Sequence, residues 1–249
     1  FEVGADEIED AVKAIRTLKM RGSNVSMPNK TLVGQYLDEL SPAARLIGAV
    51  NTVENKEGHL IGHNTDGIGF MRSVEEQGIQ MKGKSMTLLG MGGAATAICA
   101  QAALDGVEAI HIFAREGSSH RQRMETLISE LGKVTACKIE IQDIGNKQKL
   151  GEAIRESKLL VNATSVGMAP HTEECLIPDA SFLHQNLAVA DIIYNPWKTK
   201  LLTMAEKAGC TAFNGYSMLL WQGAEAFHIW TGQEMPVALV REYLQKQHI

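Results

Sequence analysis

The spacing of apolar residues changes character near residue 85 of this chain. Before that point the expected elements are short and of mixed type. In chain order they are a helix over residues 7–19, a strand or loop over residues 23–26, a helix over residues 32–40, a short helix from residue 41, a hairpin over residues 50–61 and a helix over residues 66–77. Gly22 is expected to end the first helix. Pro28 suits the entry of the second, because its missing N–H needs no partner there.

After residue 85, apolar strands alternate regularly with helices. The strands are expected over residues 86–89, 109–113, 138–141, 159–162, 187–194 and 211–213. Helices are expected between them over residues 94–104, 121–131, 150–157 and 200–208. Two closing helices are expected, one from residue 216 and one over residues 237–245. Such alternation is typical of βαβ units, which build a parallel sheet with helices on both faces. The sequence therefore predicts an α/β protein.

Composition narrows the class of protein. The 249 residues carry 24 basic and 29 acidic side chains, a net charge of −5, and 45% of them are hydrophobic. This is enough apolar material for a core, without the clustered positive charge that a nucleic-acid partner requires. No apolar run approaches the length of a membrane span. The four cysteines lie far apart with no Cys-x-x-Cys pair, so we expect free thiols, no metal site and a cytoplasmic location.

A glycine-rich turn follows the first strand of the alternating part. Gly90, Gly92 and Ala95 fit G-x-G-x-x-A, a variant of the dinucleotide fingerprint, with a strand before it and a helix after it. A tight structural turn also favours glycine, but this context favours nucleotide binding. The next strand should end at a residue that reads the ribose. Arg115 would suit the 2′-phosphate of NADP and Glu116 the free 2′-hydroxyl of NAD, so the choice between the two cofactors stays open.

A nicotinamide dehydrogenase also needs a proton donor and acceptor beside the carbonyl that accepts hydride. The candidates in the first part of the chain are Lys30, just after Pro28, and Asp66, at the start of a predicted helix. Taken singly, Lys30 is more typical of a solvated surface lysine and Asp66 of a helix N-cap. Their positions in the sequence alone therefore do not make them a catalytic pair.

Several segments, in order and spread over nearly the whole chain, resemble those of shikimate dehydrogenases. They are Ser23–Lys30 (N-V-[ST]-x-P-x-K), Gly48–Thr52 (G-A-x-N-T), Asn64–Gly67 (N-T-D-G), Gly90–Ala95 (the glycine loop), Asn162–Met168 (N-[AG]-T-x-x-G-[MI]), Asp191–Leu201 (D-x-x-Y-x-P-x-x-T-x-L) and Gly215–Ala224 (G-x-x-M-L-x-x-Q-G-A). The sequences Ser-Met-Pro-Asn-Lys and Leu-Trp-Gln-Gly-Ala are most similar to those of the quinate/shikimate branch of the family.

The resemblance implies NADP- or NAD-dependent reduction of 3-dehydroshikimate to shikimate, in aromatic amino acid biosynthesis via chorismate. It leaves open whether 3-dehydroquinate and quinate are a further substrate pair. It also implies a catalytic α/β lobe of residues 1–80 and 223–249, and a Rossmann-type lobe of residues 81–222 with a doubly wound parallel sheet. The partner would be the small-molecule substrate, with no nucleic acid or membrane, and the protein would be a monomer or a homodimer.

The resemblance also assigns roles by matching positions. Lys30 and Asp66 match the family's catalytic pair, which acts at the substrate hydroxyl with the lysine as the acid–base group. The positions implied to contact the substrate are Ser26, Asn51, Tyr194 and Gln222. The positions implied to bind the cofactor are Gly90, Gly92, Gly93, Ala94, Arg115, Thr164, Val166, Ile193, Gly215 and Met218.

Two departures from the family limit this transfer. Where the family usually has Asn-Arg after the second strand, this chain has Ala114-Arg115, so one ribose contact is lost. The family also carries a strand–helix segment ahead of the position of Phe1, with a turn that binds the substrate carboxylate, and without it we expect an exposed sheet edge and an incomplete substrate site. The alternative functions are a non-catalytic ligand sensor on the same fold and a dehydrogenase for a folate or an amino-shikimate analogue.

Overall fold

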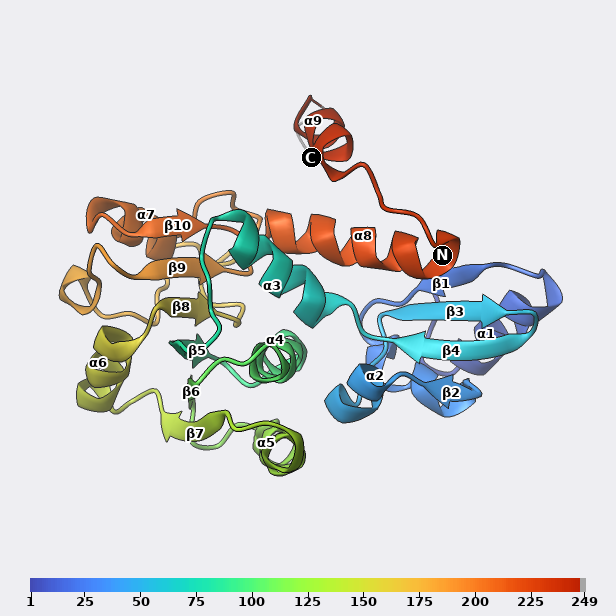
Figure 1. Ribbon diagram of the computed structural model, residues 1–249, viewed down its shortest axis with the longest axis horizontal. Helices are drawn as coiled ribbons and strands as arrows, with labels where there is room; N and C mark the ends of the chain where they lie inside the picture. Colours follow the sequence, from blue (N-terminus) through green and yellow to red (C-terminus); the bar gives the residue numbers. More distant parts are fainter. Residues whose placement is uncertain (247–249) are drawn as a thin grey trace. The chain divides into compact units, whose positions relative to one another are not determined.

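The computed structural model describes residues 1–246 and divides the chain into two compact units (Figure 1). The first unit contains residues 1–69 and the chain from residue 220 onward, and the second contains residues 70–219. Both boundaries fall inside helices, α3 (Asp66–Glu76) and α8 (Tyr216–Thr231). Each of these helices therefore contributes residues to both units.

A four-stranded mixed sheet forms the centre of the first unit. Its order is β1-β3-β4-β2, with β1 (Gly22–Asn24), β2 (Glu39–Leu40), β3 (Thr52–Lys56) and β4 (His59–His63). The central pair is the expected hairpin, in which Glu57 and Gly58 have φ values of 56° and 95°. Two successive residues with positive φ match the twist of antiparallel strands, which explains the two-residue connection.

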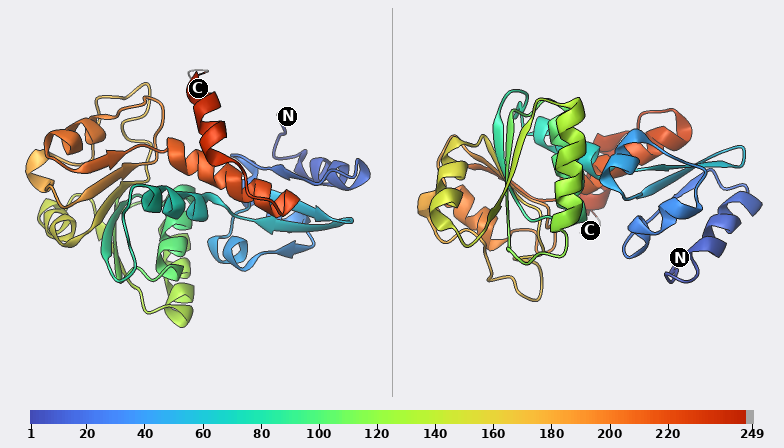
Figure 2. Two further views of the ribbon diagram at one scale, coloured as in Figure 1. Left: turned by 45° about the horizontal axis from the view of Figure 1, so that its top comes forward. Right: turned by 90° about the horizontal axis from the view of Figure 1, so that it is seen from below.

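Two helices, α1 (Ile8–Thr17) and α2 (Pro42–Ile47), pack with this sheet (Figure 2). Ser41 begins α2 by accepting a hydrogen bond from the Ala44 N–H at 3.2 Å, as its position before Pro42 predicts. The buried cluster shared by helices and sheet consists of Ile8, Val12, Ile15, Val33, Ala44, Val50, Val53 and Leu60. This cluster is the core of the first unit.

The helix expected over residues 32–40 is wrong. The segment forms two 3₁₀ turns, η1 (Asn29–Thr31) and η2 (Val33–Tyr36), and then strand β2, which pairs in parallel with β4. Leu37 and Leu40 pack over Gly62 of β4, where an added Cβ would lie within 2.8 Å of both side chains. Contact with the sheet therefore overrides the helical spacing of the apolar residues.

The expected role of Gly22 is also wrong. Helix α1 ends at Thr17, and Lys19, with φ of 52°, adopts the left-handed conformation that follows it. Gly22 instead begins β1, where an added Cβ would overlap the carbonyl oxygen of Val53 on β3 and the ring of Trp230. Glycine is needed there because the two backbones and the indole ring approach closely.

The second unit is the doubly wound α/β fold that the sequence predicts. Its six parallel strands are β5 (Ser85–Leu89), β6 (Ala109–Ala114), β7 (Lys138–Asp143), β8 (Leu159–Asn162), β9 (Ala188–Asp191) and β10 (Thr211–Phe213), in the order β10-β9-β8-β5-β6-β7. The connecting helices are α4 (Gly93–Leu104), α5 (Arg121–Val134), α6 (Lys147–Glu156) and α7 (Lys200–Lys207), with a 3₁₀ turn η3 (Ala180–Phe182). Helices α4 and α5 cover one face of the sheet, and α6 and α7 the other (Figure 2).

Strand β9 is shorter than the strand expected over residues 187–194. It ends at Asp191, whose Oδ1 accepts a hydrogen bond from the Ile193 N–H at 3.1 Å. The neighbouring β8 ends in the same way at Asn162, whose Oδ1 accepts from the Thr164 N–H at 3.2 Å. These Asx turns redirect the chain at the carboxyl edge of the sheet, where doubly wound folds bind their ligands.

Helix α8 and the final helix α9 (Val237–Lys246) agree with the two closing helices that the sequence predicts. Within residues 1–246, no helix combines the length and the apolar character needed to cross a bilayer. The same part of the chain contains no group of three or more His, Cys, Asp and Glu side chains placed to hold a metal ion.

Candidate functional site

Lys30 and Asp66 form an ion pair in the first unit. Lys30 lies in η1, and Asp66 is the first residue of α3. Lys30 Nζ donates a hydrogen bond to Asp66 Oδ2 at 2.7 Å, and the two side chains are 25% and 15% exposed. The pair is therefore largely, but not completely, shielded from water.

Asn51 connects the ion pair to other polar side chains. Its Nδ2 donates to Asp66 Oδ1 and to Thr65 Oγ1, both at 2.9 Å, and lies 3.3 Å from Gln222 Oε1. Its Oδ1 accepts the Thr65 N–H at 2.9 Å. Asn51 and Thr65 are 2% and 1% exposed, so these bonds form away from solvent and fix the side-chain orientations. Thr65 was not predicted, and its only signal is its place in the Asn64–Gly67 segment.

Local backbone features assemble this network. Asn64 Oδ1 accepts a hydrogen bond from the Asp66 N–H at 3.1 Å, so an Asx turn starts α3 and directs Asp66 toward Asn51. Gly69, one turn further along α3, allows the backbone of α8 to approach, since an added Cβ would lie 2.6 Å from Gln222 N. The close crossing of the two helices brings Gln222 to the network.

The other two predicted substrate contacts lie outside this network. Ser26 is exposed, and its Oγ donates to the Met27 carbonyl oxygen at 3.3 Å. Tyr194 belongs to the second unit, where it follows β9 and is 50% exposed. Their roles as substrate contacts stay predictions.

The glycine-rich turn lies at the carboxyl end of β5 in the second unit. Gly90 has φ of 107°, and an added Cβ would lie 2.8 Å from Thr164 Cγ2, so glycine is needed there on both counts. Gly92 caps α4 in an extended conformation without a side-chain hydrogen bond. A Cβ on Gly92 or Gly93 would meet no described atom within 4 Å. The start of α4 is thus clear of side chains, as binding of a pyrophosphate requires.

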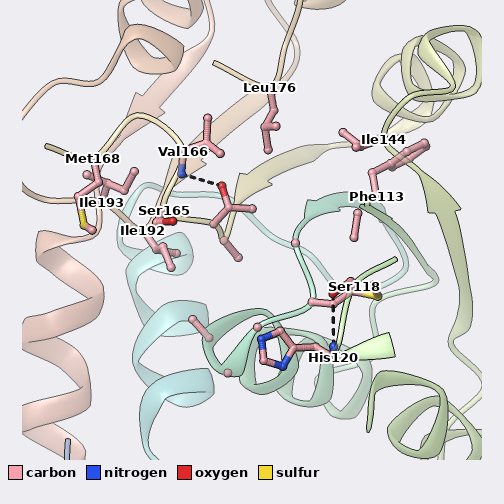
Figure 3. A pocket seen from close by; sticks show the side chains of 18 of the residues that line it. Phe113, Ser118, His120, Ile144, Ser165, Val166, Met168, Leu176, Ile192 and Ile193 are labelled. Carbon is pink, nitrogen blue, oxygen red and sulfur yellow. Dashed lines mark hydrogen bonds between the residues drawn. The ribbon is translucent and has the colours of Figure 1, made fainter. Parts of the chain in front are cut away.

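A cavity of about 910 Å³ opens beside this turn. Most of the predicted cofactor residues line it: Gly90, Gly92, Gly93, Ala94, Arg115, Thr164, Val166 and Ile193. In the view of Figure 3, Val166, Ile192 and Ile193 are drawn on one side and Phe113 and Ile144 on the opposite side. The bare helix start and the size and lining of the cavity fit a nicotinamide dinucleotide.

One end of the cavity follows β6, where the ribose of a dinucleotide is expected. Arg115 lines this end together with Ser118 and His120, which sequence reasoning did not single out. Ser118 Oγ accepts a hydrogen bond from the His120 N–H at 3.4 Å (Figure 3). Glu116 is not one of the described lining residues.

Two predicted cofactor residues, Gly215 and Met218, do not line the cavity. The Gly215 N–H donates to the Ile193 carbonyl oxygen at 3.1 Å, and an added Cβ would overlap the Ile192 carbonyl oxygen. Gly215 therefore supports the segment that contains Ile193 by close backbone packing. Met218 is half-buried in the first turn of α8. Their direct contact with a cofactor stays a prediction.

Sequence reasoning missed a buried polar cluster next to the cavity. Asp191 Oδ1 accepts hydrogen bonds from Asn162 Nδ2 at 3.0 Å and from the Ile193 N–H at 3.1 Å, and Oδ2 accepts from Thr199 Oγ1 at 2.7 Å. Burial raises the pKa of Asp191, although these three hydrogen bonds favour its charged form. The signal that was present is positional: Asn162 and Asp191 each open a family-like segment and each end a strand.

Comparison with known proteins agrees with this geometry. A family model for the shikimate dehydrogenase substrate binding domain matches residues 1–53, and one for the shikimate 5′-dehydrogenase C-terminal domain matches residues 215–245. Shikimate dehydrogenase (NADP(+)) of Listeria monocytogenes is 51% identical over 244 residues, which cover 98% of this chain and 84% of that protein. Quinate/shikimate dehydrogenase of Escherichia coli is 45% identical with the same coverage.

The solved structures include a complex of shikimate 5-dehydrogenase from Listeria monocytogenes with shikimate and NAD. It matches this chain with a TM-score of 0.94 and 51% identity, covering 98% of this chain and 84% of that one. The resemblance found in the sequence motifs is thus confirmed at the level of the family. This chain belongs to the shikimate dehydrogenase family.

Proposed function

We propose that this protein catalyses the reversible, NAD(P)-dependent reduction of 3-dehydroshikimate to shikimate. The observation that carries this function is the Lys30–Asp66 ion pair, which Asn51 joins to Thr65 and Gln222. A cationic proton donor among amide and hydroxyl groups suits a ring that carries one ketone and several hydroxyls. The first unit then supplies the substrate side, and the cavity of the second unit supplies the cofactor side.

Lys30 acts at the oxygen that alternates between ketone and hydroxyl. In the direction of reduction, Lys30 Nζ donates a proton to this oxygen, and in the direction of oxidation the neutral amine accepts it. A bound nicotinamide dinucleotide, held by the residues that line the cavity, would supply the hydride donor or acceptor for the ring carbon. Asp66, with its Oδ2 at 2.7 Å from Nζ, holds the lysine in a fixed direction and so keeps the proton donor in place between turnovers.

The remaining substrate hydroxyls are recognised by the amides of Asn51 and Gln222, with Ser26 and Tyr194 as further contacts. Both amide hydrogens of Asn51 are directed at Asp66 and Thr65, so a substrate hydroxyl bound to Asn51 shares or replaces one of these bonds. The substrate is thereby placed next to the acid–base pair.

Both cofactors are proposed substrates of this enzyme. Arg115 at the β6 end of the cavity suits the 2′-phosphate of NADP, and the related enzymes comprise an NADP(+) enzyme and a complex with NAD. We also propose a cytoplasmic location, which the four free cysteines favour. Light scattering of the purified protein will distinguish a monomer from a homodimer.

The test is to follow formation of reduced nicotinamide by absorbance, with the full-length protein and four pairings of shikimate or quinate with NADP+ or NAD+. Turnover of shikimate is expected, and turnover of quinate would extend the proposal to the second substrate pair. No turnover with any of the four pairings refutes the proposed function. Binding of cofactor or shikimate without turnover would favour the ligand sensor instead.

A further inference from the structure

The strand order of the second unit assigns the two halves of a dinucleotide to different loops. Strands β8 and β9 lie on one side of β5, and β6 and β7 lie on the other. The pyrophosphate binds at the glycine turn after β5, and the ribose on the adenine side is read past β6. The nicotinamide half must then lie toward the loops that follow β8 and β9. Asn162 and Asp191, the last residues of these strands, are directly paired in the sheet.

Asn162 uses its whole hydrogen-bonding capacity to hold the loop after β8. Its Nδ2 donates to Asp191 Oδ1 at 3.0 Å and to the Val166 carbonyl oxygen at 3.1 Å. Its Oδ1 accepts from the N–H and the Oγ1 of Thr164, at 3.2 and 2.7 Å. An amide has two donors and two acceptor lone pairs, so Asn162 has a single favourable orientation. That orientation fixes both Thr164 and Val166.

Asp191 extends the same control to the loop after β9 and to α7. Besides Asn162, it accepts hydrogen bonds from the Ile193 N–H and from Thr199 Oγ1. Thr199 in turn caps α7 by accepting from the Leu202 N–H at 3.3 Å. Asp191, Asn162 and Thr199 are all buried, and in such surroundings each of these hydrogen bonds is strong and its loss is costly.

The side chains held in this way face the cavity. Val166 and Ile193 both line it (Figure 3), and the Val166 N–H donates to Thr164 Oγ1 at 3.1 Å. We propose that Asp191 is a positioning residue. Through Asn162 and the Ile193 N–H, it holds Val166 and Ile193 as the wall that orients the nicotinamide half of the cofactor. This inference rests on the proposed dehydrogenase function and extends it to a residue that touches neither substrate nor cofactor.

Two substitutions test the proposal by calorimetric titration. Asp191→Asn replaces one acceptor oxygen with a donor, and Thr199→Val removes the hydroxyl that anchors Asp191 Oδ2. Each variant is titrated with NADP+ and NAD+, and with 2′-phospho-ADP-ribose and ADP-ribose, which lack the nicotinamide. We expect the affinity for the complete dinucleotides to fall about tenfold and that for the fragments to stay within about twofold of wild type. In turnover, kcat should fall while the KM for shikimate changes little.

Two control substitutions separate positioning from general damage. Thr199→Ser keeps the hydroxyl, so its affinities for the dinucleotides and the fragments should equal those of the wild type. Thr87→Val removes a buried hydrogen bond of 2.9 Å to Ser157 elsewhere in the second unit, and should lower thermal stability without changing the ratio of dinucleotide to fragment affinity.

Two results would overturn the inference: equal losses for dinucleotides and fragments, or unchanged affinities in both Asp191→Asn and Thr199→Val. Failure of the proposed function would look different. Wild-type protein would then bind NADP+ but turn over neither shikimate nor quinate, and the affinity ratios of the variants would still report on Asp191.

Discussion

Replacement of Lys30 by methionine tests the proposed chemistry most directly. Methionine retains an unbranched apolar side chain but removes the ammonium that donates to Asp66 at 2.7 Å. Asp66 still accepts a hydrogen bond from Asn51 Nδ2 at 2.9 Å and stays at the start of α3, where the helix dipole favours a negative charge. The local fold therefore loses one partner of an ion pair while the carboxylate keeps another donor.

The expected losses of activity and of stability differ greatly in size. Proton transfer by a positioned side chain contributes about 10²–10⁴-fold to the rate, so kcat should fall on the order of 10³-fold, or about 4 kcal/mol of transition-state stabilisation. The ion pair is largely shielded from water, but Asp66 keeps the hydrogen bond from Asn51, so removal of Nζ should cost about 2 kcal/mol of folding free energy. For a chain of this length that corresponds to a Tm decrease of roughly 4–8 °C. Unfolding therefore cannot account for the expected loss of activity.

The assay measures kcat and KM for shikimate oxidation, with cofactor affinity determined separately by titration. Affinity for NADP+ should stay within about twofold of wild type, because Lys30 belongs to the first unit and does not line the cavity of the second. Lys13→Met is the matched control, since Lys13 forms ion pairs with Glu9 and Asp10 on an exposed face of the same unit. A Lys30→Met enzyme with kcat within about tenfold of wild type would remove Lys30 from the mechanism.

Two further predictions concern the second unit. Arg115→Ala should weaken NADP+ binding about tenfold and NAD+ binding less than about twofold, because only NADP+ carries the 2′-phosphate. Glu116→Ala is the control variant. Equal losses of affinity for both cofactors in Arg115→Ala would contradict the assignment. Burial raises the pKa of the Cys99 thiol to about 12 and that of Cys137 to about 11, so both stay protonated in the folded protein. At about pH 8, iodoacetamide should therefore alkylate the buried Cys99 only after unfolding, as followed by mass spectrometry, and should label the partly buried Cys137 slowly. Rapid labelling of native Cys99 would refute this.

The fold of the second unit was predictable because its signals are local. Most strands are short apolar runs, and a helix follows all of the first five except β8, so the alternation itself indicates a parallel sheet. In the first unit the same type of evidence failed at residues 32–40. Their apolar spacing suits a helix, but contact of Leu37 and Leu40 with Gly62 on β4 decides the structure. A competition between a local preference and a distant surface cannot be read from spacing.

In the candidate site, too, some features depend on nearby residues and others on residues far apart in the sequence. The motifs identified Lys30 and Asp66, but the orientation of Asp66 depends on Asn51, which precedes β3 and donates to Thr65 and Asp66 at the start of α3. By contrast, the Asx turn at Asp191 is a local feature, because the accepting carboxylate of Asp191 lies only two residues before the Ile193 N–H that donates to it.

The bond from Asn162 to Asp191 is of a different kind, because it exists only when β8 and β9 are neighbours. That adjacency belongs to the observed strand order, and the alternation of strands and helices predicts a parallel sheet without giving this order. A buried Asn or Asp at the carboxyl end of two consecutive strands is therefore a sequence signal for a pair that holds the ligand-binding loops. In this chain Asn162 and Asp191 are the two residues that fit this description.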